Sequence, residues 1–246
     1  MITLAHLSDL HLDGSERSAD RAARAMAYLN DLPQPLDAVL VTGDIADHGR
    51  TDEYEEAHKV LSSPHPVFTC PGNHDVRSAY RRVLLGQDGS EAPINQVHRA
   101  AGATFALCDS TIPGQDDGLL SEETIAWLET VLGEARGEGP VFICFHHPPV
   151  TLGMPFVDSI RQRGEQRLAD LVVRHPHVVA LLCGHAHTAA ATTFAGRPLL
   201  VAPGIVSTAK LPWERGDFVD LRLPPAVAFH ILDDDLRLTT HYRVIV

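Results

Sequence analysis

The sequence predicts an α/β fold, and three observations support this prediction. Short apolar runs alternate with amphipathic segments along the 246 residues, as in a chain built from strand–helix units. The runs are apolar at nearly every position, which is typical of a sheet that helices cover on both faces. The last runs have no helix between them, so we expect a second, mostly antiparallel portion packed against the first.

The first half of the chain predicts three strands, each followed by a helix. Segment 17–31 carries apolar residues at helical spacing, among them Ala22 and Leu29, with Arg and Asp on its other face. Thr51 is the expected N-cap of the second helix. The expected elements are a strand in ITLAHLSDLHL, a helix over 17–31, a strand in DAVLVTGDI, a helix over 51–62, a strand in PVFTC and a short helix around 77–85.

The second half continues this alternation after an irregular stretch. Ser121 is the expected cap of a helix with a Glu-rich first turn, and prolines end the strand that follows it. The expected elements are a strand in GATFALCDS, a helix in SEETIAWLETVL, a strand in PVFICFHHPP, a helix over 164–174, a strand in VVALLCG and strands near 198–202, 226–233 and 238–245.

Organisation and composition narrow the class of protein. No repeat, low-complexity block or linker divides the chain, so we expect one domain over 1–246, with the last ~45 residues completing the second sheet. Lys and Arg number 20 against 32 Asp and Glu, a net charge of −12, which disfavours polymeric nucleic acid and anionic membranes as partners. The four cysteines lie in or beside apolar runs, and the N-terminus has no basic leader, so we expect a reduced, cytoplasmic protein.

Aspartate, asparagine and histidine residues directly follow several of the apolar strands. In open α/β sheets the carboxyl ends of the strands form the ligand crevice, so residues far apart in sequence can meet there. The sequence therefore predicts a single site at this edge. The residues are Asp9 and His11 in SDLH, Asp44 in TGDI, Asn73, His74 and Asp75 in GNHD, His146 and His147 in FHHPP, and His185 and His187 in GHAH.

The residue types point to metal chemistry. Carboxylates, an amide oxygen and imidazoles without a thiolate suit Zn, Mn, Fe or Co. They are too many for one tetrahedral ion, whereas two ions roughly 3.5–4 Å apart and bridged by a carboxylate would use them all. Residues i and i+2 of an extended backbone share a face, which would aim D-x-H and H-x-H at the ions. Glycine before Asp44, Asn73 and His185 leaves room for a sharp turn beside the metals.

These motifs together resemble the calcineurin-like metallophosphoesterases, whose pattern is D-x-H, G-D, G-N-H-[DE], a lone His and G-H-x-H. The match runs from Asp9 to His187 and is complete. Within the family, the segments DSTIPGQDDGLLSEETIAWLE, HHPPV and CGHAHT look most like the bacterial group of class III cyclic nucleotide phosphodiesterases and glycerophosphodiesterases. The resemblance implies a four-layer α/β/β/α sandwich with two central mixed sheets.

The resemblance also implies a role for each residue of the site. His146 is preferred to His147 because the family histidine stands two residues before a proline. His147 would then support a ligand, face the substrate or simply pack. The implied ligands are Asp9, His11 and His187 for the first ion, Asn73, His146 and His185 for the second, and Asp44 as the bridge.

The expected reaction is hydrolysis of a small phosphodiester. A water shared by two Mn, Fe or Zn ions would lose a proton near neutral pH and attack phosphorus in line. His74 is the candidate general acid for the leaving alkoxide. Asp75 would orient its imidazole, cap the helix that follows, or do both.

The sequence constrains the substrate and the partners less than it constrains the site. The expected substrates are small diesters such as 3′,5′-cyclic nucleotides, with glycerophosphodiesters and 2′,3′-cyclic nucleotides as alternatives. A phosphomonoesterase, a nuclease and a non-catalytic module of the same fold are rival readings, the last disfavoured because every ligand is present. His48, Arg161, Arg163 and Trp213 lie on loops expected to flank the site, as solvated side chains or substrate contacts. By analogy with the bacterial group we expect a homodimer.

Overall fold

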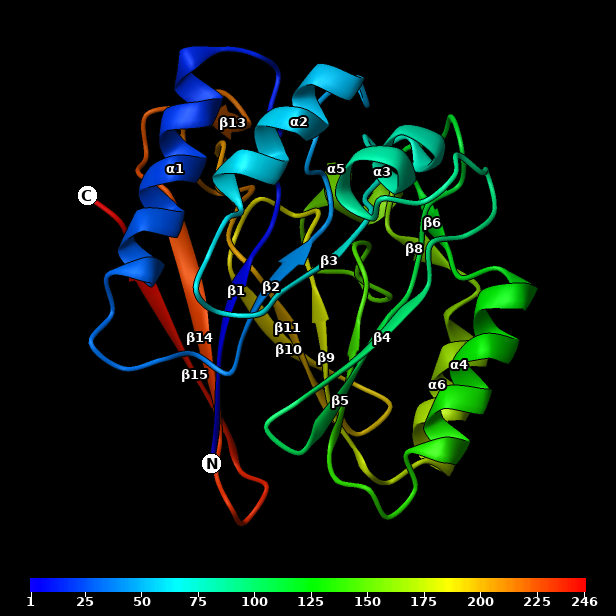
Figure 1. The fold of residues 1–246 in the computed structure, drawn as a ribbon. Coiled ribbons are helices and arrows are strands. Elements are labelled where there is room, and N and C mark those ends of the chain that lie inside the picture. Colours follow the sequence, from blue (N-terminus) through cyan, green and yellow to red (C-terminus); the bar gives the residue numbers. More distant parts are fainter.

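The strands form two large sheets that face each other, with helices on both outer sides (Figure 1). The computed structural model describes all residues 1–246. The first sheet has the order β15-β14-β1-β2-β3 and the second the order β10-β11-β9-β7-β5-β4. Both sheets are mixed: β1–β3 and β5, β7, β9 and β11 pair in parallel, while β14, β15, β4 and β10 pair antiparallel. This is the four-layer arrangement that the resemblance implied.

The strands are short, as expected for buried sheets. In the first sheet they are β1 Ile2–Leu7, β2 Ala38–Thr42, β3 Val67–Cys70, β14 Ala226–Leu232 and β15 Leu238–Val244. In the second they are β4 Gln96–Ala100, β5 Ala103–Leu107, β7 Val141–Cys144, β9 Val178–Cys183, β10 Ala190–Phe194 and β11 Arg197–Val201. Two small ribbons pair β6 Gly118–Leu119 with β8 Gln162–Arg163 and β12 Thr208–Ala209 with β13 Val219–Asp220.

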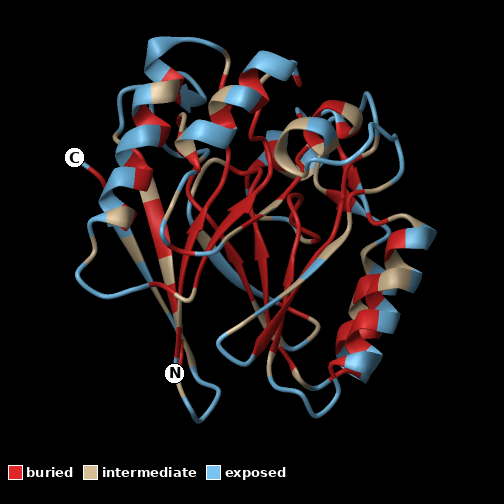
Figure 2. Cartoon of the chain, viewed as in Figure 1, coloured by how far each residue is buried: buried red, intermediate tan, exposed pale blue.

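Three apolar clusters correspond to the three interfaces between four layers. One joins the first sheet to α1 Glu16–Asn30, α2 Thr51–Val60 and α3 Arg77–Leu84. Another joins the second sheet to α4 Glu122–Glu134 and α6 Glu165–Arg174. The third lies between the sheets and includes Leu40, Phe105 and Leu182. Figure 2 shows the result, with buried strands inside and helices that are exposed on their outer faces.

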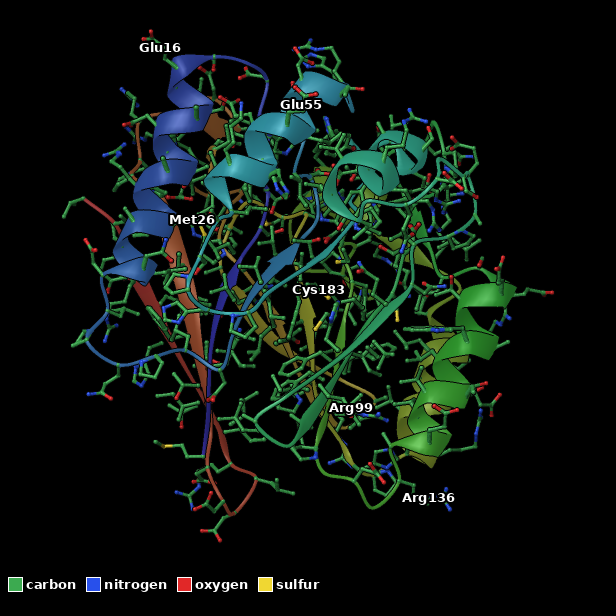
Figure 3. All side chains as sticks on the ribbon, viewed as in Figure 1. Glu16, Met26, Glu55, Arg99, Arg136 and Cys183 are labelled. Carbon is green, nitrogen blue, oxygen red and sulfur yellow. The ribbon has the colours of Figure 1, made fainter.

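Side-chain direction follows the helical and strand periods. Met26 of α1 points toward the first sheet and is buried, and Cys183 lies in the interior at the end of β9 (Figure 3). Glu16 and Glu55 point to solvent from α1 and α2. All four cysteines are buried and unpaired, as expected from their apolar surroundings. No helix combines the length and the apolar character that crossing a bilayer requires.

Most expected elements are present, and the departures have local causes. The cap of α4 is Ser121, whose side chain accepts from the Thr124 amide, as predicted. The predicted helix over 51–62 is present as α2, but its predicted N-cap, Thr51, was wrong, because Arg50 is the N-cap and the Glu53 carboxylate accepts from the Arg50 amide. β4 and β10 were missed because these edge strands are half exposed and carry few apolar residues.

The prediction for the last part of the chain needs correction. We expected the last ~45 residues to complete the second sheet. Instead, β14 pairs with β1, and β15 pairs with β14, so both strands extend the sheet that the N-terminus begins. Antiparallel pairing of β14 covers the edge of β1 and makes β15 the edge strand, an arrangement that the sequence pattern of β14 alone does not specify.

Candidate metal centre

The predicted site residues meet at one edge, where the carboxyl ends of β1, β2, β3, β7 and β9 lie together. The first sheet contributes residues after β1, β2 and β3, and the second contributes residues after β7 and β9. In chain order they are Asp9, His11, Asp44, Asn73, His74, Asp75, His146, His147, His185 and His187.

The backbone at this edge is unusual. Five of the predicted ligands have positive φ: Asp9 (56°), His11 (44°), Asp44 (48°), His185 (70°) and His187 (49°). Non-glycine residues seldom adopt this left-handed conformation, and when they do it is often at functional sites. The D-x-H and H-x-H pairs therefore do not converge through extended backbone, as we had expected from their spacing. They converge because tight left-handed turns follow β1, β2 and β9.

Two glycines make these turns possible through close backbone approach. A Cβ at Gly72 would overlap the carboxylate and amide of Asp44, and one at Gly184 would overlap Ser8 and approach the Thr42 carbonyl to 2.8 Å. The glycines before Asn73 and His185 thus let neighbouring strand ends touch, as the sequence predicted.

One group of ligand atoms comes from Asp9, His11, Asp44 and His187, all within 4.8 Å of one another. The Nε2 atoms of His11 and His187 are 3.1 Å apart. Nε2 of His11 is 3.4 Å from Oδ2 of Asp44, and Nε2 of His187 is 3.4 Å from Oδ1 of Asp9. Two imidazole nitrogens thus face each other between two carboxylates.

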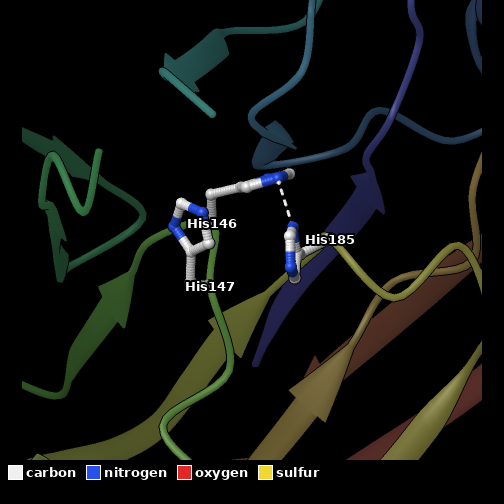
Figure 4. A group of neighbouring side chains, drawn as sticks. All are labelled: His146, His147 and His185. Atoms are coloured by element: carbon white, nitrogen blue, oxygen red, sulfur yellow. Dashed lines mark hydrogen bonds between the residues drawn. The ribbon is translucent and has the colours of Figure 1, made fainter. Parts of the chain in front are cut away.

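A second group lies on the other side of Asp44. Nε2 of His146 is 3.3 Å from Oδ2 of Asp44 and 3.2 Å from Nδ1 of His185 (Figure 4). That Nδ1 is in turn 3.1 Å from Oδ1 of Asn73. Oδ2 of Asp44 therefore lies within 3.4 Å of an imidazole nitrogen of each group.

Hydrogen bonds from outside the site orient the imidazoles. Nδ1–H of His11 donates to Asp47, at 2.8 Å, and Nδ1–H of His146 donates to the carbonyl of Thr42, at 2.7 Å. Nδ1 of His187 is hydrogen-bonded to the hydroxyl of Ser207, at 2.8 Å. Placing the proton on Nδ1 leaves the lone pair of Nε2 facing inward, as in metal-binding histidines.

The donor set fits divalent metal ions. Oδ1 of Asp9 is buried and has no hydrogen-bond partner, although it is surrounded by imidazole nitrogens. A buried carboxylate oxygen without a partner is costly unless a cation neutralises it. Inward-facing imidazoles and carboxylates together match the N/O ligands of Zn, Mn or Fe.

The charges inside the site are strongly coupled. Burial would lower the pKa of His146, but the carboxylates of Asp44 and Asp9 outweigh it and raise that pKa to about 9. Burial would raise the pKa of Asp44, yet His146 and His11 hold it well below its usual range. Burial, reinforced by His146, lowers the pKa of His185 to about 3. Asp44 is therefore ionised.

His74 stands beside this cluster, and its partner differs from the one expected. Its Nδ1–H donates to the main-chain carbonyl of Asp47, at 2.8 Å, and lies 3.6 Å from the Asp47 carboxylate. Its own amide donates to Oδ1 of Asp44. The imidazole is partly exposed and sits edge-on to His11, with ring centroids 4.5 Å apart.

Asp75 does not contact the imidazole of His74 and does not cap α3, so both expected roles are corrected. Its carboxylate accepts from the amides of Ile45, Ala46 and Gly72 and from the hydroxyl of Tyr54. These bonds tie the loop after β3 to the loop after β2. Burial, with the nearby charge of Asp44, raises the pKa of Asp75 to about 6.

Of the roles left open for His147, the structure favours packing. Its Nδ1 is hydrogen-bonded to Ser110, at 2.8 Å, and its Nε2–H donates to the carbonyl of Asp116. The ring is fully buried beside His146 and His185 (Figure 4). Both nitrogens are engaged, so His147 holds the loop with Asp116 in place, although it also belongs to a group with His146 and His185 whose ligand atoms lie within 4.8 Å of one another.

The other residues proposed to flank the site are mostly engaged elsewhere. His48 is bonded to Glu53, and Arg163 pairs with Asp117. Arg161 donates to two main-chain carbonyls and to Glu165. Trp213 is 77% exposed.

A cavity of about 330 Å³ opens over four of the predicted ligands, Asp44, Asn73, His185 and His187. Its floor is polar, and its walls come from α5 Pro155–Ser159 and from the ribbon β12–β13. The lining residues are Asp44, Asn73, His74, Asp116, Phe156, Val157, Ile160, His185, Ala186, His187, Ala209, Phe218 and Val219.

Sequence reasoning missed three supports of the site. Asp47 follows Asp44 by three residues in the same loop, so a second carboxylate in GDIAD was a visible signal. Ser207 is 20 positions from its partner His187, and the Thr42 support is a main-chain carbonyl. Neither of these leaves a side-chain pattern that points to the site.

Comparison with known proteins agrees with this geometry. The family described as "Calcineurin-like phosphoesterase" matches residues 2–189. The chain is 34% identical to glycerophosphodiester phosphodiesterase GpdQ of Enterobacter lignolyticus, over 92% of this chain and 86% of that protein. It is 32% identical to the 3′,5′-cyclic adenosine monophosphate phosphodiesterase CpdA of Pseudomonas aeruginosa, over 97% of this chain and 88% of that one.

Similarity to solved structures supports the fold alone. A dimetal phosphatase from Danio rerio superimposes with a TM-score of 0.74, covering 100% of this chain and 96% of that one at 16% identity. A purple acid phosphatase from yellow lupin gives a TM-score of 0.71 at 14% identity, over 99% of this chain and 51% of that one. At these identities the shared feature is the layered architecture.

Proposed function

Since the chain belongs to the calcineurin-like phosphoesterase family, we propose that it is a metal-dependent phosphodiesterase with a two-metal site acting on small phosphodiesters. The observation that carries the proposal is the position of Asp44. Its Oδ2 lies 3.4 Å from Nε2 of His11 and 3.3 Å from Nε2 of His146, so one carboxylate serves both ligand groups.

The ligands divide into two sets that share Asp44. One set is Asp9, His11 and His187, and the other is Asn73, His146 and His185. Two bound ions would lower the pKa of a water and neutralise charge on the phosphoryl oxygens. The protein's contribution is to fix the imidazoles through Asp47, Thr42 and Ser207, so that their lone pairs face the ions.

His74 is proposed to protonate the leaving alcohol oxygen. Its Nδ1–H is held by the Asp47 carbonyl, which leaves Nε2 to carry and release a proton. The imidazole lines the cavity and is not among the proposed ligands. Asp75 supports this arrangement indirectly, because it fixes the loop that carries His74.

A small diester is the substrate class that best fits the cavity. About 330 Å³ is at the lower end of ligand pockets. The two relatives described above are named for a glycerophosphodiester and for a 3′,5′-cyclic nucleotide. Both are small diesters, and the net charge of −12 disfavours polymeric nucleic acid.

The test is hydrolysis by metal-stripped protein reloaded with Mn²⁺ or Zn²⁺, with the metal counted by elemental analysis. The substrates are 3′,5′-cyclic AMP, 2′,3′-cyclic AMP, glycerophosphoethanolamine and a phosphomonoester. We expect about two metals per chain and faster turnover of diesters than of the monoester. Folded protein that binds no metal would instead support a non-catalytic module, and a preference for the monoester would support a phosphatase.

A further inference from the structure

Asp109 is a strand-end carboxylate that belongs to neither ligand group. It stands two residues after β5, which runs parallel to β7 and ends at the same edge, and it is 1% exposed. Its oxygens accept from the amide of Ile94, at 2.8 Å, and from the amide and the hydroxyl of Thr111, at 2.8 and 2.7 Å. The fourth donor is Arg77. Four protein donors satisfy this carboxylate without a cation, in contrast to Oδ1 of Asp9.

Arg77 reaches Asp109 from the loop that follows β3 of the first sheet. It is the first residue of α3, three positions after His74, and is 9% exposed. Its Nε–H donates to Oδ2 of Asp109, at 2.8 Å, and its two terminal nitrogens donate to the carbonyls of Glu91 and Thr111, both at 2.9 Å. One planar guanidinium therefore holds three points of the chain in a fixed geometry, which a lysine ammonium could not reproduce.

This ion pair joins the two halves of the site. The loop after β3 carries Asn73 and His74, and Asp75 already ties that loop to its neighbour in the first sheet. Arg77 ties the same loop to the second sheet. Oδ1 of Asn73 is 3.1 Å from Nδ1 of His185, which the second sheet supplies. The separation of the two loops therefore decides whether this contact forms.

The other end of the tie lies against the histidines of the second sheet. Ser110, between Asp109 and Thr111, is hydrogen-bonded to Nδ1 of His147, at 2.8 Å. The ring of His147 lies against that of His185, with centroids 4.6 Å apart. A change at the ion pair would therefore act on both sides of the contact between the loops.

A buried ion pair is a weak source of stability, because the desolvation of two charges offsets much of their attraction. We propose that Arg77, through Asp109, is a positioning residue that sets the loop with Asn73 and His74 against the histidines of the second sheet. Arg77 neither lines the cavity nor belongs to a ligand group. Its effect on turnover rests on the proposed phosphodiesterase function, whereas its effect on the loop does not.

The first experiment measures kcat and KM of Mn²⁺-loaded protein on the small diester that the wild type hydrolyses fastest. Arg77→Gln removes the guanidinium, and Arg77→Lys keeps a cation beside Asp109 but not all three bonds. The control Arg174→Gln breaks an ion pair with Glu129 that joins α6 to α4 on the outer face. We expect Arg77→Gln to lower kcat by about 10²-fold and Arg77→Lys by about tenfold, since misplaced groups slow turnover. KM should change by less than about threefold, and Arg174→Gln should match the wild type.

The double variant Arg77→Gln/Asp109→Asn, compared with Asp109→Asn, tests whether the two residues act as one unit. Its loss in kcat should be no larger than that of Arg77→Gln alone, because the effects of coupled residues do not add. Additive losses would overturn the role of the pair, and so would wild-type kcat in folded Arg77→Gln. Should Arg77→Gln not fold, Arg77→Lys decides the matter, and wild-type kcat in that variant overturns the proposal.

A second arm does not depend on hydrolysis. Hydrogen–deuterium exchange on metal-stripped protein follows the segment 71–77, in which the amides of Gly72, His74 and Asp75 are hydrogen-bonded. Arg77→Gln should speed exchange of this segment by about tenfold relative to Arg174→Gln, and leave β14 of the first sheet unchanged. This result supports the positioning role even if no diester is hydrolysed, in which case only the proposed function fails. Unchanged exchange in 71–77, or an equal rise in β14, overturns it.

Discussion

Two pairs of buried histidines differ in what surrounds them. His146 and His185 lie at the strand ends, and His6 and His230 lie in the middle of the first sheet. Nδ1 of His6 meets Nε2 of His230, at 3.1 Å. The remaining nitrogens of the second pair are hydrogen-bonded to the hydroxyls of Thr42 and Thr240, both at 2.8 Å. That pair is fully satisfied without any ligand.

The difference shows that burial alone does not mark a site. Burial lowers the pKa of His230 to about 3, and no carboxylate opposes it. The same burial acts on His146, yet Asp44 and Asp9 raise its pKa to about 9. Equal burial therefore gives a neutral structural pair in one place and a charge-bearing cluster in the other. The neighbouring carboxylates of Asp44 and Asp9, which have no counterpart beside His230, are what separates the two.

The largest effect is expected from removing the carboxylate shared by both ligand groups. Asp44→Ala should abolish activity, by at least about 10³-fold in kcat, and should lose at least one metal per chain. Elemental analysis and kcat on a small diester measure both. His230→Gln is the control for loss of a buried polar group, and it should retain both metals because His230 is hydrogen-bonded to His6 and Thr240 and to none of the ligands. Two metals retained by Asp44→Ala would refute the bridging role.

A smaller loss is expected at His74, which we assign to proton transfer. His74→Ala should keep both metals and lower kcat by about 10²–10⁴-fold. The loss should be greatest for alkyl leaving groups and small for a nitrophenyl leaving group, which needs no protonation. The measurements are kcat of the variant on both kinds of diester and its metal content by elemental analysis. Release of a metal by His74→Ala would mean that this histidine is a ligand and not a free general acid.

A loss of intermediate size is expected at Asp47, which supports His11 and His74 without contacting the proposed metals. Asp47→Asn should weaken metal binding or activity by about 10–100-fold, as for other supports of metal-bound imidazoles. The measurement is a Zn²⁺ titration with a competing chelator, followed by kcat at saturating metal. Asp75→Asn serves as the comparison, because it should lower the stability of the fold and shift the loop while changing metal affinity less than Asp47→Asn does. Equal metal affinity in Asp47→Asn and wild type would rule out this support.

Much of this site could be predicted because its ligands are local motifs at strand ends. Apolar runs followed by Asp9, Asp44 or His185 are visible in the sequence, and the fold brings such ends together. The order of most helices and strands followed from periodicity in the same way. What the sequence did not specify is non-local: the left-handed turns at the ligands, the support of His187 by Ser207, and the pairing of β14 with β1.

The Asp47 and Asp75 assignments show the limit of local reasoning. Asp75 is adjacent to His74, so sequence proximity suggested that it orients the imidazole. In the folded chain Asp75 turns inward to three amides, and Asp47, from another loop, lies beside His74. Which of two carboxylates reaches a histidine depends on loop geometry, and a motif does not contain that geometry.

The smallest expected effect concerns the structural pair and its response to pH. The folded-state pKa of His230 lies below the unfolded value of about 6.5, because burial disfavours the charged ring. Its neutral state therefore stabilises the fold fully above pH 6.5, and this contribution is lost as pH falls from 6.5 toward 3. The slope is about 1 kcal/mol per pH unit. His146 has the opposite sign in metal-free protein, since its raised pKa gives a contribution lost as pH rises toward 9.

The variant that tests this contrast is His230→Gln in metal-free protein, measured by urea unfolding between pH 7.5 and 5. It should be less stable than wild type at pH 7.5 by about 1–3 kcal/mol, because Nδ1 of His6 loses a buried partner. Its stability should nevertheless fall less steeply below pH 6.5, because one buried neutral histidine is gone. His241→Gln, on β15 and exposed, controls for the loss of a histidine. An acid slope identical to that of wild type would mean that burial of His230 does not set the pH response, and the contrast with His146 would then rest on the carboxylates alone.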